Sequence, residues 1–185
     1  LDEFFRIRVA SIRNLKKAGK KSRRELDFDP SEILRHIHRI VNRQGEEFSR
    51  IFQEQIVPEL RQHNIHLLRR LELNQPQKEW VENYFHNHLL PFVQPMLLVG
   101  NKIRPFLANA HIYLAVHLRP KDKPKARSEY ALVKIPSDQL PRFLVLPPSA
   151  SGRHDLIMLD DVVRHSVTWL FPGYDVRDAF SIKST

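Results

Sequence analysis

One stripe of apolar residues at helical spacing constrains the fold of this chain more than any other feature of the sequence. Asp29 is a natural N-cap, Pro30 suits the first helical position, and Glu32 would complete a capping box. Gly45 and Pro58 are expected to weaken or kink the helix without ending it. The stripe keeps nearly one face for about eight turns; its members are Ile33, Ile37, Val41, Phe48, Phe52, Ile56 and Leu60. A long helix with an apolar face is therefore predicted, and that face needs a covering element.

The start of the chain supplies a first partner for this helix. Apolar residues recur at Leu1, Phe5, Val9 and Ile12, which predicts a helix from residue 1 to about residue 18, ended by Gly19. Two antiparallel helices with apolar stripes form a helical hairpin. No capping residue precedes Leu1, so we expect the chain to be a piece of a longer protein, with further helices completing a bundle.

The helical pattern changes after about residue 64. Residues 65–73 are predicted to be a short extended or helical stretch. Asn74 to Gln77 is a start signal for a second helix, which should end before Pro91. Further prolines at positions 95 and 105 predict irregular chain to about residue 108. We find no motif in residues 94–108 and assign them no role.

From His111 onward the apolar period falls to two. Strands are predicted at residues 112–118 and 130–135, joined as a hairpin by a charged loop. Further strands are predicted at 142–146 and 179–183, with a helix capped by Asp160 between them. The predicted fold class is α+β, with an N-terminal antiparallel helical hairpin over residues 1–64. An α+β head domain with a small, mainly antiparallel sheet follows over residues 65–185.

The charge of the chain points to an anionic partner. The formal net charge is +9 among 185 residues, and the first helix with the loop after it is its most basic part. A solvated helix surface, nucleic acid, an acidic membrane surface and a phosphate polymer all fit that charge. The lysines and arginines concerned are Arg6, Arg8, Arg13, Lys16, Lys17, Lys20, Lys21, Arg23 and Arg24.

The sequence contains no complete active site of a recognisable kind. The absence of cysteine excludes disulfides, thiolate nucleophiles and Cys-based zinc sites, and none of the five glycines lies in a phosphate-binding loop motif. His36 and His38 point to different faces of one predicted helix, so they cannot share a metal. We therefore predict no catalytic residue and no metal site. The aromatic residues on apolar stripes are predicted to be core residues, which disfavours a single-strand nucleic-acid binder; they are Phe4, Phe5, Trp80, Tyr84, Phe85 and Trp169.

Several segments, taken in order, resemble the polyphosphate kinases of the two-histidine type. The first ten residues resemble that family's SNLDEFF signature, and later segments resemble its W-x-x-x-Y-F helix, its central strand and its IPS…PRF…LPP run. The match covers almost the whole chain, which makes it far more specific than any one motif. The segments are Leu1–Ala10, Trp80–Phe85, Tyr113–Val116, Ile135–Pro148, Phe171–Gly173 and Ser181–Lys183.

This resemblance implies a larger enzyme built of a helical N-terminal domain, a head domain and two C-terminal domains related to phospholipase D. The present chain would be the later part of the N-terminal domain and most of the head, truncated at its C-terminal end. The implied reaction is reversible transfer of the ATP γ-phosphate to polyphosphate through a phosphohistidine, with Mg²⁺. The reacting histidines of the family lie in the C-terminal domains, so we expect no turnover by this chain alone and no tightly bound cofactor on it.

The resemblance also assigns expected sites and partners. Leu1 is expected at the rim of the nucleotide site, next to a signature asparagine that would precede it. The implied partners are ATP or ADP, polyphosphate, the C-terminal domains of the same chain and a second copy, with the head in the dimer interface. The implied location is cytoplasmic, with peripheral association at the inner membrane as an open alternative. Polyphosphate is expected to meet the first helix, unless its cations are only a solvated surface; those cations are Arg6, Arg8, Arg13, Lys16 and Lys17.

Two other classes of function stay open at this point. A basic helical module on an α+β scaffold could bind nucleic acid, although the expected burial of the aromatic residues argues against it. A pure dimerisation module, in which the charge is incidental, is the other alternative.

Overall fold

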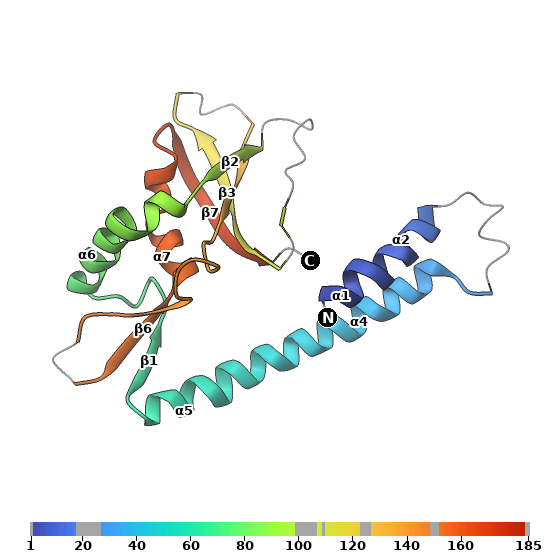
Figure 1. The fold of residues 1–185 in the computed structure, drawn as a ribbon, viewed down its shortest axis with the longest axis horizontal. Coiled ribbons are helices and arrows are strands. Elements are labelled where there is room, and N and C mark those ends of the chain that lie inside the picture. Colours follow the sequence, from blue (N-terminus) through green and yellow to red (C-terminus); the bar gives the residue numbers. More distant parts are fainter. Residues whose placement is uncertain are drawn as a thin grey trace. The chain divides into compact units, whose positions relative to one another are not determined.

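The computed structural model describes residues 2–17, 27–98, 107–108, 110–122, 127–148 and 152–183. Its internal contacts divide the chain into a first unit, residues 1–59, and a second unit, residues 60–184. The fold class is the predicted one: helices come first, and a mixture of strands and helices follows (Figure 1).

The first unit contains the predicted hairpin. Its first arm consists of α1 (Asp2–Phe4), the π-helical turn η1 (Phe5–Val9) and α2 (Ala10–Lys17). Its second arm is α4 (Pro30–Ile51), which lies alongside α2 in Figure 1. The predicted cap is confirmed, because the Asp29 carboxylate accepts a hydrogen bond from the Ser31 amide at 2.8 Å.

The long helix continues past both of its weak points. It runs through Gly45 and passes by the π-helical turn η2 (Phe52–Ile56) into α5 (Val57–Gln62). Pro58 has no amide hydrogen, and its ring crowds the carbonyl one turn earlier. The wider turn of η2 directly before it relieves that crowding while the helix continues, as expected from the sequence.

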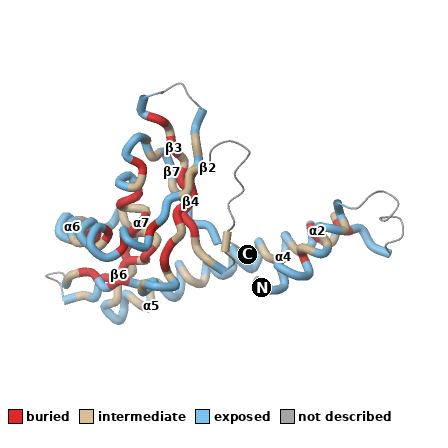
Figure 2. The backbone as a smooth tube through the Cα atoms, turned by 45° about the horizontal axis from the view of Figure 1, so that its top comes forward, coloured by how far each residue is buried: buried red, intermediate tan, exposed pale blue. Residues whose placement is uncertain are grey.

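No member of the apolar stripe on the long helix is fully buried, and the buried Leu34 lies beside the stripe. Leu34 is 9% exposed and Val9 is fully buried, but Phe48 is 72% exposed. Figure 2 shows the same contrast, with buried residues gathered in the strands of the second unit while α4 is mostly intermediate or exposed. The short α2 reaches only the first turns of α4, which agrees with the expectation that the hairpin does not cover its own apolar face.

The second unit holds a four-stranded antiparallel sheet in the order β2-β4-β3-β7. The predicted hairpin is confirmed, since β3 and β4 pair in antiparallel register. One expectation was wrong: chain predicted to be irregular around Pro95 forms strand β2. Proline is tolerated there because it is the first residue of an edge strand. The strands are β2 (Pro95–Leu98), β3 (Ile112–Pro120), β4 (Glu129–Lys134) and β7 (Tyr174–Lys183).

A second, three-stranded sheet has the order β1-β6-β5. Its strands are β1 (Ile65–Leu68), β5 (Phe143–Val145) and β6 (His154–Met158). β1 and β6 are parallel, whereas β5 and β6 are antiparallel. The structure thus has two small sheets where one was predicted, because the β5 strand expected from its sequence joins the strand after it instead of the β3–β4 hairpin.

Helices pack on these sheets and close one apolar core. They are α6 (Gln75–Tyr84), continued by η3 (Phe85–Leu89) and η4 (Leu90–Phe92), and α7 (Leu159–His165), followed by the 3₁₀ turn η6 (Val167–Leu170). Asn74 and Gln77 form a reciprocal capping box at the start of α6, as their spacing predicts. Asp160, predicted to cap α7, does not do so. The N-cap is Met158, and the Asp160 carboxylate instead accepts a hydrogen bond from Ser181 Oγ at 2.7 Å.

A buried carboxylate ties the start of α6 to β6. Asp155 is 1% exposed, and its Oδ2 accepts a hydrogen bond from Gln77 Nε2 at 2.7 Å. Its Oδ1 lies 2.8 Å from Arg153 Nε, at an angle that makes this contact an ion pair and not an aligned hydrogen bond. Gln77 is itself 3% exposed, and the hydrogen bond to Asp155 gives its buried amide group an acceptor inside the unit.

A second carboxylate of this unit predicts a pH effect. Burial raises the pKa of Asp161 above its ordinary value of 3.8, although the nearby Arg164 guanidinium opposes the shift. Between those two pKa values the folded state holds a proton that the unfolded state has released, so stability falls as pH rises through this window. Asp161→Asn should therefore raise the melting temperature at pH 7, and its advantage should shrink toward pH 3.

Thermal melts at pH 3, 5 and 7 measure this effect. Asp175→Asn is the control, since Asp175 lies at an exposed ion pair 3.8 Å from Arg177 and should change little at any pH. An Asp161→Asn variant that is less stable than the wild type at pH 7 would mean that attraction to Arg164 outweighs burial.

Candidate polyanion-binding site

The five cations predicted from the first helix are all exposed, and they lie on two successive helical segments of the first unit. Arg6 and Arg8 belong to η1, and the Arg6 guanidinium lies 3.8 Å from the Glu3 carboxylate. Arg13, Lys16 and Lys17 belong to α2. Leu1, predicted at a nucleotide rim, lies outside the described residues.

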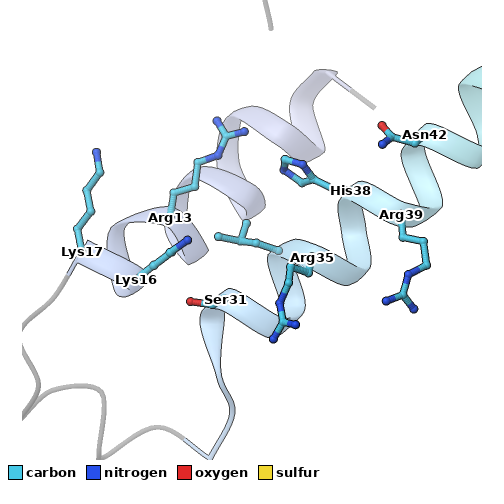
Figure 3. A pocket seen from close by; sticks show the side chains of 9 residues that line it. Arg13, Lys16, Lys17, Ser31, Arg35, His38, Arg39 and Asn42 are labelled. Atoms are coloured by element: carbon cyan, nitrogen blue, oxygen red, sulfur yellow. The ribbon is translucent and has the colours of Figure 1, made fainter.

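Three of the five predicted cations line a groove between α2 and α4 (Figure 3). The groove has a volume of about 950 Å³. Arg6 and Arg8 are not among its lining residues. From α2 it is lined by Arg13, Lys16 and Lys17, and from α4 by Ser31, Leu34, Arg35, His38, Arg39 and Asn42.

The α4 side of the groove was missed in the sequence. Arg35 and Arg39 are one helical turn apart, as are His38 and Asn42, so each pair lies along one line of the helix surface. That spacing was a usable signal. The apolar stripe dominates the pattern of α4, and polar residues beside such a stripe are usually only solvated, so their spacing alone does not indicate a groove.

The groove has the electrostatics of an anion site. None of its described lining residues is acidic, and its five arginines and lysines form no ion pair within the described part of the chain. Farther along α4, by contrast, Arg50 lies 2.9 Å from Glu47 and 3.7 Å from Glu54. Cations without a carboxylate partner leave a positive potential that attracts an anion from solution.

A smaller pocket in the second unit has a different character. Its volume is about 490 Å³, and it contains Arg142 and Lys183 together with the carboxylate of Asp160. Ser181 in this pocket is already engaged, because it donates to Asp160 and accepts from Arg164 Nη2 at 2.6 Å. Mixed charge and internal hydrogen bonds make this pocket a weaker candidate for an anion than the groove.

Two of the aromatic residues predicted in the core are on the surface. Phe85 is fully buried, but Phe4 is 45% exposed and Trp169 is 63% exposed. The helix predicted to continue α7 changes at Ser166 into a 3₁₀ turn, which has three residues per turn, so extrapolating the 3.6-residue stripe misplaces Trp169. The Trp169 ring packs edge-on against His86, with centroids 4.8 Å apart.

Metal sites and membrane-spanning helices are two further features that could indicate a function. Within the described ranges, no group of three or more His, Asp or Glu side chains is arranged to hold a metal ion. The helices of those ranges also include none that is both long enough and apolar enough to cross a bilayer.

Comparison with known families identifies the architecture. A model of the polyphosphate kinase N-terminal domain matches residues 1–68, and a model of the polyphosphate kinase middle domain matches residues 76–185. The chain belongs to the polyphosphate kinase family. The middle domain corresponds to the head domain expected from the sequence motifs, so the resemblance drawn from those motifs is confirmed.

Individual members of the polyphosphate kinase family show the same coverage. The chain is 33% identical over 190 residues to a polyphosphate kinase of Halalkalibacterium halodurans and 30% identical to that of Escherichia coli K12. It aligns along its full length with 26% and 27% of these proteins, so it spans about a quarter of their length. The crystal structure of polyphosphate kinase from Porphyromonas gingivalis superposes with a TM-score of 0.81 at 34% identity, over 98% of this chain and 26% of that one.

Proposed function

We propose that this chain is the non-catalytic N-terminal and head region of a polyphosphate kinase, which reversibly transfers the ATP γ-phosphate to inorganic polyphosphate. Membership of the family across two consecutive domains supports this assignment. None of its ten histidines falls at a position that the resemblance assigns to phosphoryl transfer. The phosphohistidine and the Mg²⁺ that offsets phosphate charge are assigned to the rest of the enzyme, and the described residues offer no three-ligand metal site for that ion.

The part that this region plays is to hold the polymer. Polyphosphate carries about one negative charge per phosphate, and each phosphate that a cation neutralises releases condensed counterions, as in nucleic acid. The observation that carries this proposal is the run of exposed cations on η1 and α2, most of which pair with no carboxylate among the residues that the structure describes. The proposed contacts are Arg6, Arg8, Arg13, Lys16 and Lys17, while Leu1 is proposed at the rim of the nucleotide site.

Titration calorimetry with inorganic polyphosphate tests the polymer-holding role. The chain should bind polyphosphate in preference to single-stranded DNA of equal charge, with an affinity that falls steeply between 50 and 200 mM salt, as expected for several phosphate contacts. Binding of neither polymer, or a clear preference for DNA, would contradict this role, and the second result would favour the nucleic-acid module.

A second copy of the chain is the proposed partner of the head unit. β7 is an edge strand whose neighbour on one side is β3. It carries exposed apolar side chains, with Phe180 59% and Ile182 39% exposed. An exposed edge of this kind is a template for strand pairing, and a twofold axis would bring two such edges together.

Light scattering after size-exclusion chromatography tests the dimer. The expected mass is twice that of the 21.9 kDa chain, and Phe180→Lys should shift it toward one copy, because a charge on an edge strand opposes pairing. A wild-type chain that runs as a single copy at high micromolar concentration would contradict the proposed dimer.

A further inference from the structure

We infer that the α2–α4 groove binds a linear run of phosphates, which contact arginines of α4 as well as the cations of α2. This inference rests on the proposed polymer-holding role and deepens it. It assigns phosphate binding to Arg35 and Arg39, which were not among the predicted contacts. It does not include Arg6 and Arg8, because they do not line the groove.

The arrangement of the cations favours a chain-like ligand over a compact one. Arg35 and Arg39 are four residues apart on α4, and Arg13 and Lys17 are four apart on α2, which places each pair about 6 Å apart along its helix axis. Figure 3 shows that these side chains extend to different sides of the helix pair and do not converge on one point. A single phosphate or a nucleotide triphosphate would need convergence, whereas a flexible polymer contacts such cations one after another.

The rest of the lining favours a polymer that has charge but no bases. No Phe, Tyr or Trp side chain belongs to the described lining, and its one aliphatic residue, Leu34, is only 9% exposed. Proteins that bind single-stranded nucleic acid add aromatic platforms on which bases stack. Ser31, His38 and Asn42 can donate hydrogen bonds, so every polar group of the lining is able to meet a phosphate oxygen.

Paired alanine substitutions in the chain test the inference. Arg35→Ala with Arg39→Ala removes two lining cations, and Arg43→Ala with Arg61→Ala removes two exposed helical arginines that do not line the groove. Both double variants lose the same charge, and alanine preserves the helix. The groove variant should bind long-chain inorganic polyphosphate about tenfold more weakly at 150 mM salt, with the slope of log affinity against log salt lower by about 1 for each removed arginine.

The control variant should lose no more than about twofold in affinity. Equal losses in the two variants would overturn the groove while leaving the polymer-holding role intact. A wild-type chain that binds no polyphosphate would overturn the role itself, so the two failures are distinguishable. Tripolyphosphate binding as tightly as the long chain would show a compact anion site, and tighter binding of single-stranded DNA would show a nucleic-acid site; either result overturns the inference. Circular dichroism confirms that both variants keep their helices.

Discussion

Phe85→Ala is expected to lower the free energy of unfolding of the second unit by about 3–5 kcal/mol. Phe85 is fully buried where α6 passes into η3, and it belongs to the same core as residues of β3, β4 and β6. Truncation loses the favourable free energy of burying the ring. It also leaves a cavity, which the strands of the two surrounding sheets cannot move together to fill. Urea denaturation followed by the fluorescence of Trp80 and Trp169, which both lie in this unit, measures the change.

Phe143→Ala is the matched control for this loss. Phe143 is a phenylalanine of the same unit, but it is 48% exposed at the start of β5, so its truncation should cost no more than about 1 kcal/mol. Similar losses in the two variants would mean that Phe85 does not lie at the centre of the core.

Asp155→Ala is expected to cost about 2–4 kcal/mol, the second largest effect. The substitution leaves the Nε2 group of Gln77 buried without its acceptor and removes the partner of Arg153. Gln77 is also the third residue of α6 and forms the capping box with Asn74, so its displacement would loosen the start of that helix as well. Chemical denaturation of the chain measures the loss.

Asp155→Asn separates the hydrogen bond from the charge. Asparagine keeps an oxygen that can accept from Gln77 and gives up only the attraction to Arg153, so it should recover more than half of the stability lost in Asp155→Ala. An asparagine variant as unstable as the alanine variant would show that the ion pair with Arg153, and not the hydrogen bond from Gln77, supplies most of the stability.

The sequence was most informative where local chemistry alone decides the structure. Asp29 and Asn74 start helices because their side chains accept amide hydrogen bonds within three residues, and the alternation around Ala115 requires a strand. Such signals depend on neighbours a few positions away, so they can be recognised without a fold. The family motifs added the order of the two domains, which no local pattern contains.

The features that the sequence missed depend on distant partners. Strand β2 forms at Pro95 because it can pair with β4. Strand β5 pairs with β6, and the alternation of apolar and polar residues in β5 does not specify which strand it pairs with. The groove likewise needs two helices side by side: Arg13 and Arg35 are 22 positions apart, and only the hairpin turns them into one surface. Charge composition predicted an anion partner but not which face would meet it.

The parallel pairing of β1 with β6 delays the folding of β1 while the chain is synthesised on the ribosome. Residue 65 pairs with residue 154, so β1 leaves the exit tunnel about 90 residues before its partner exists. At a synthesis rate of about 5–20 residues per second, β1 waits roughly 5–20 s with its edge exposed. During that interval the nascent chain depends on solubilising charge or on a chaperone, and β1 is among the last strands to pair, although it is the first strand to be synthesised.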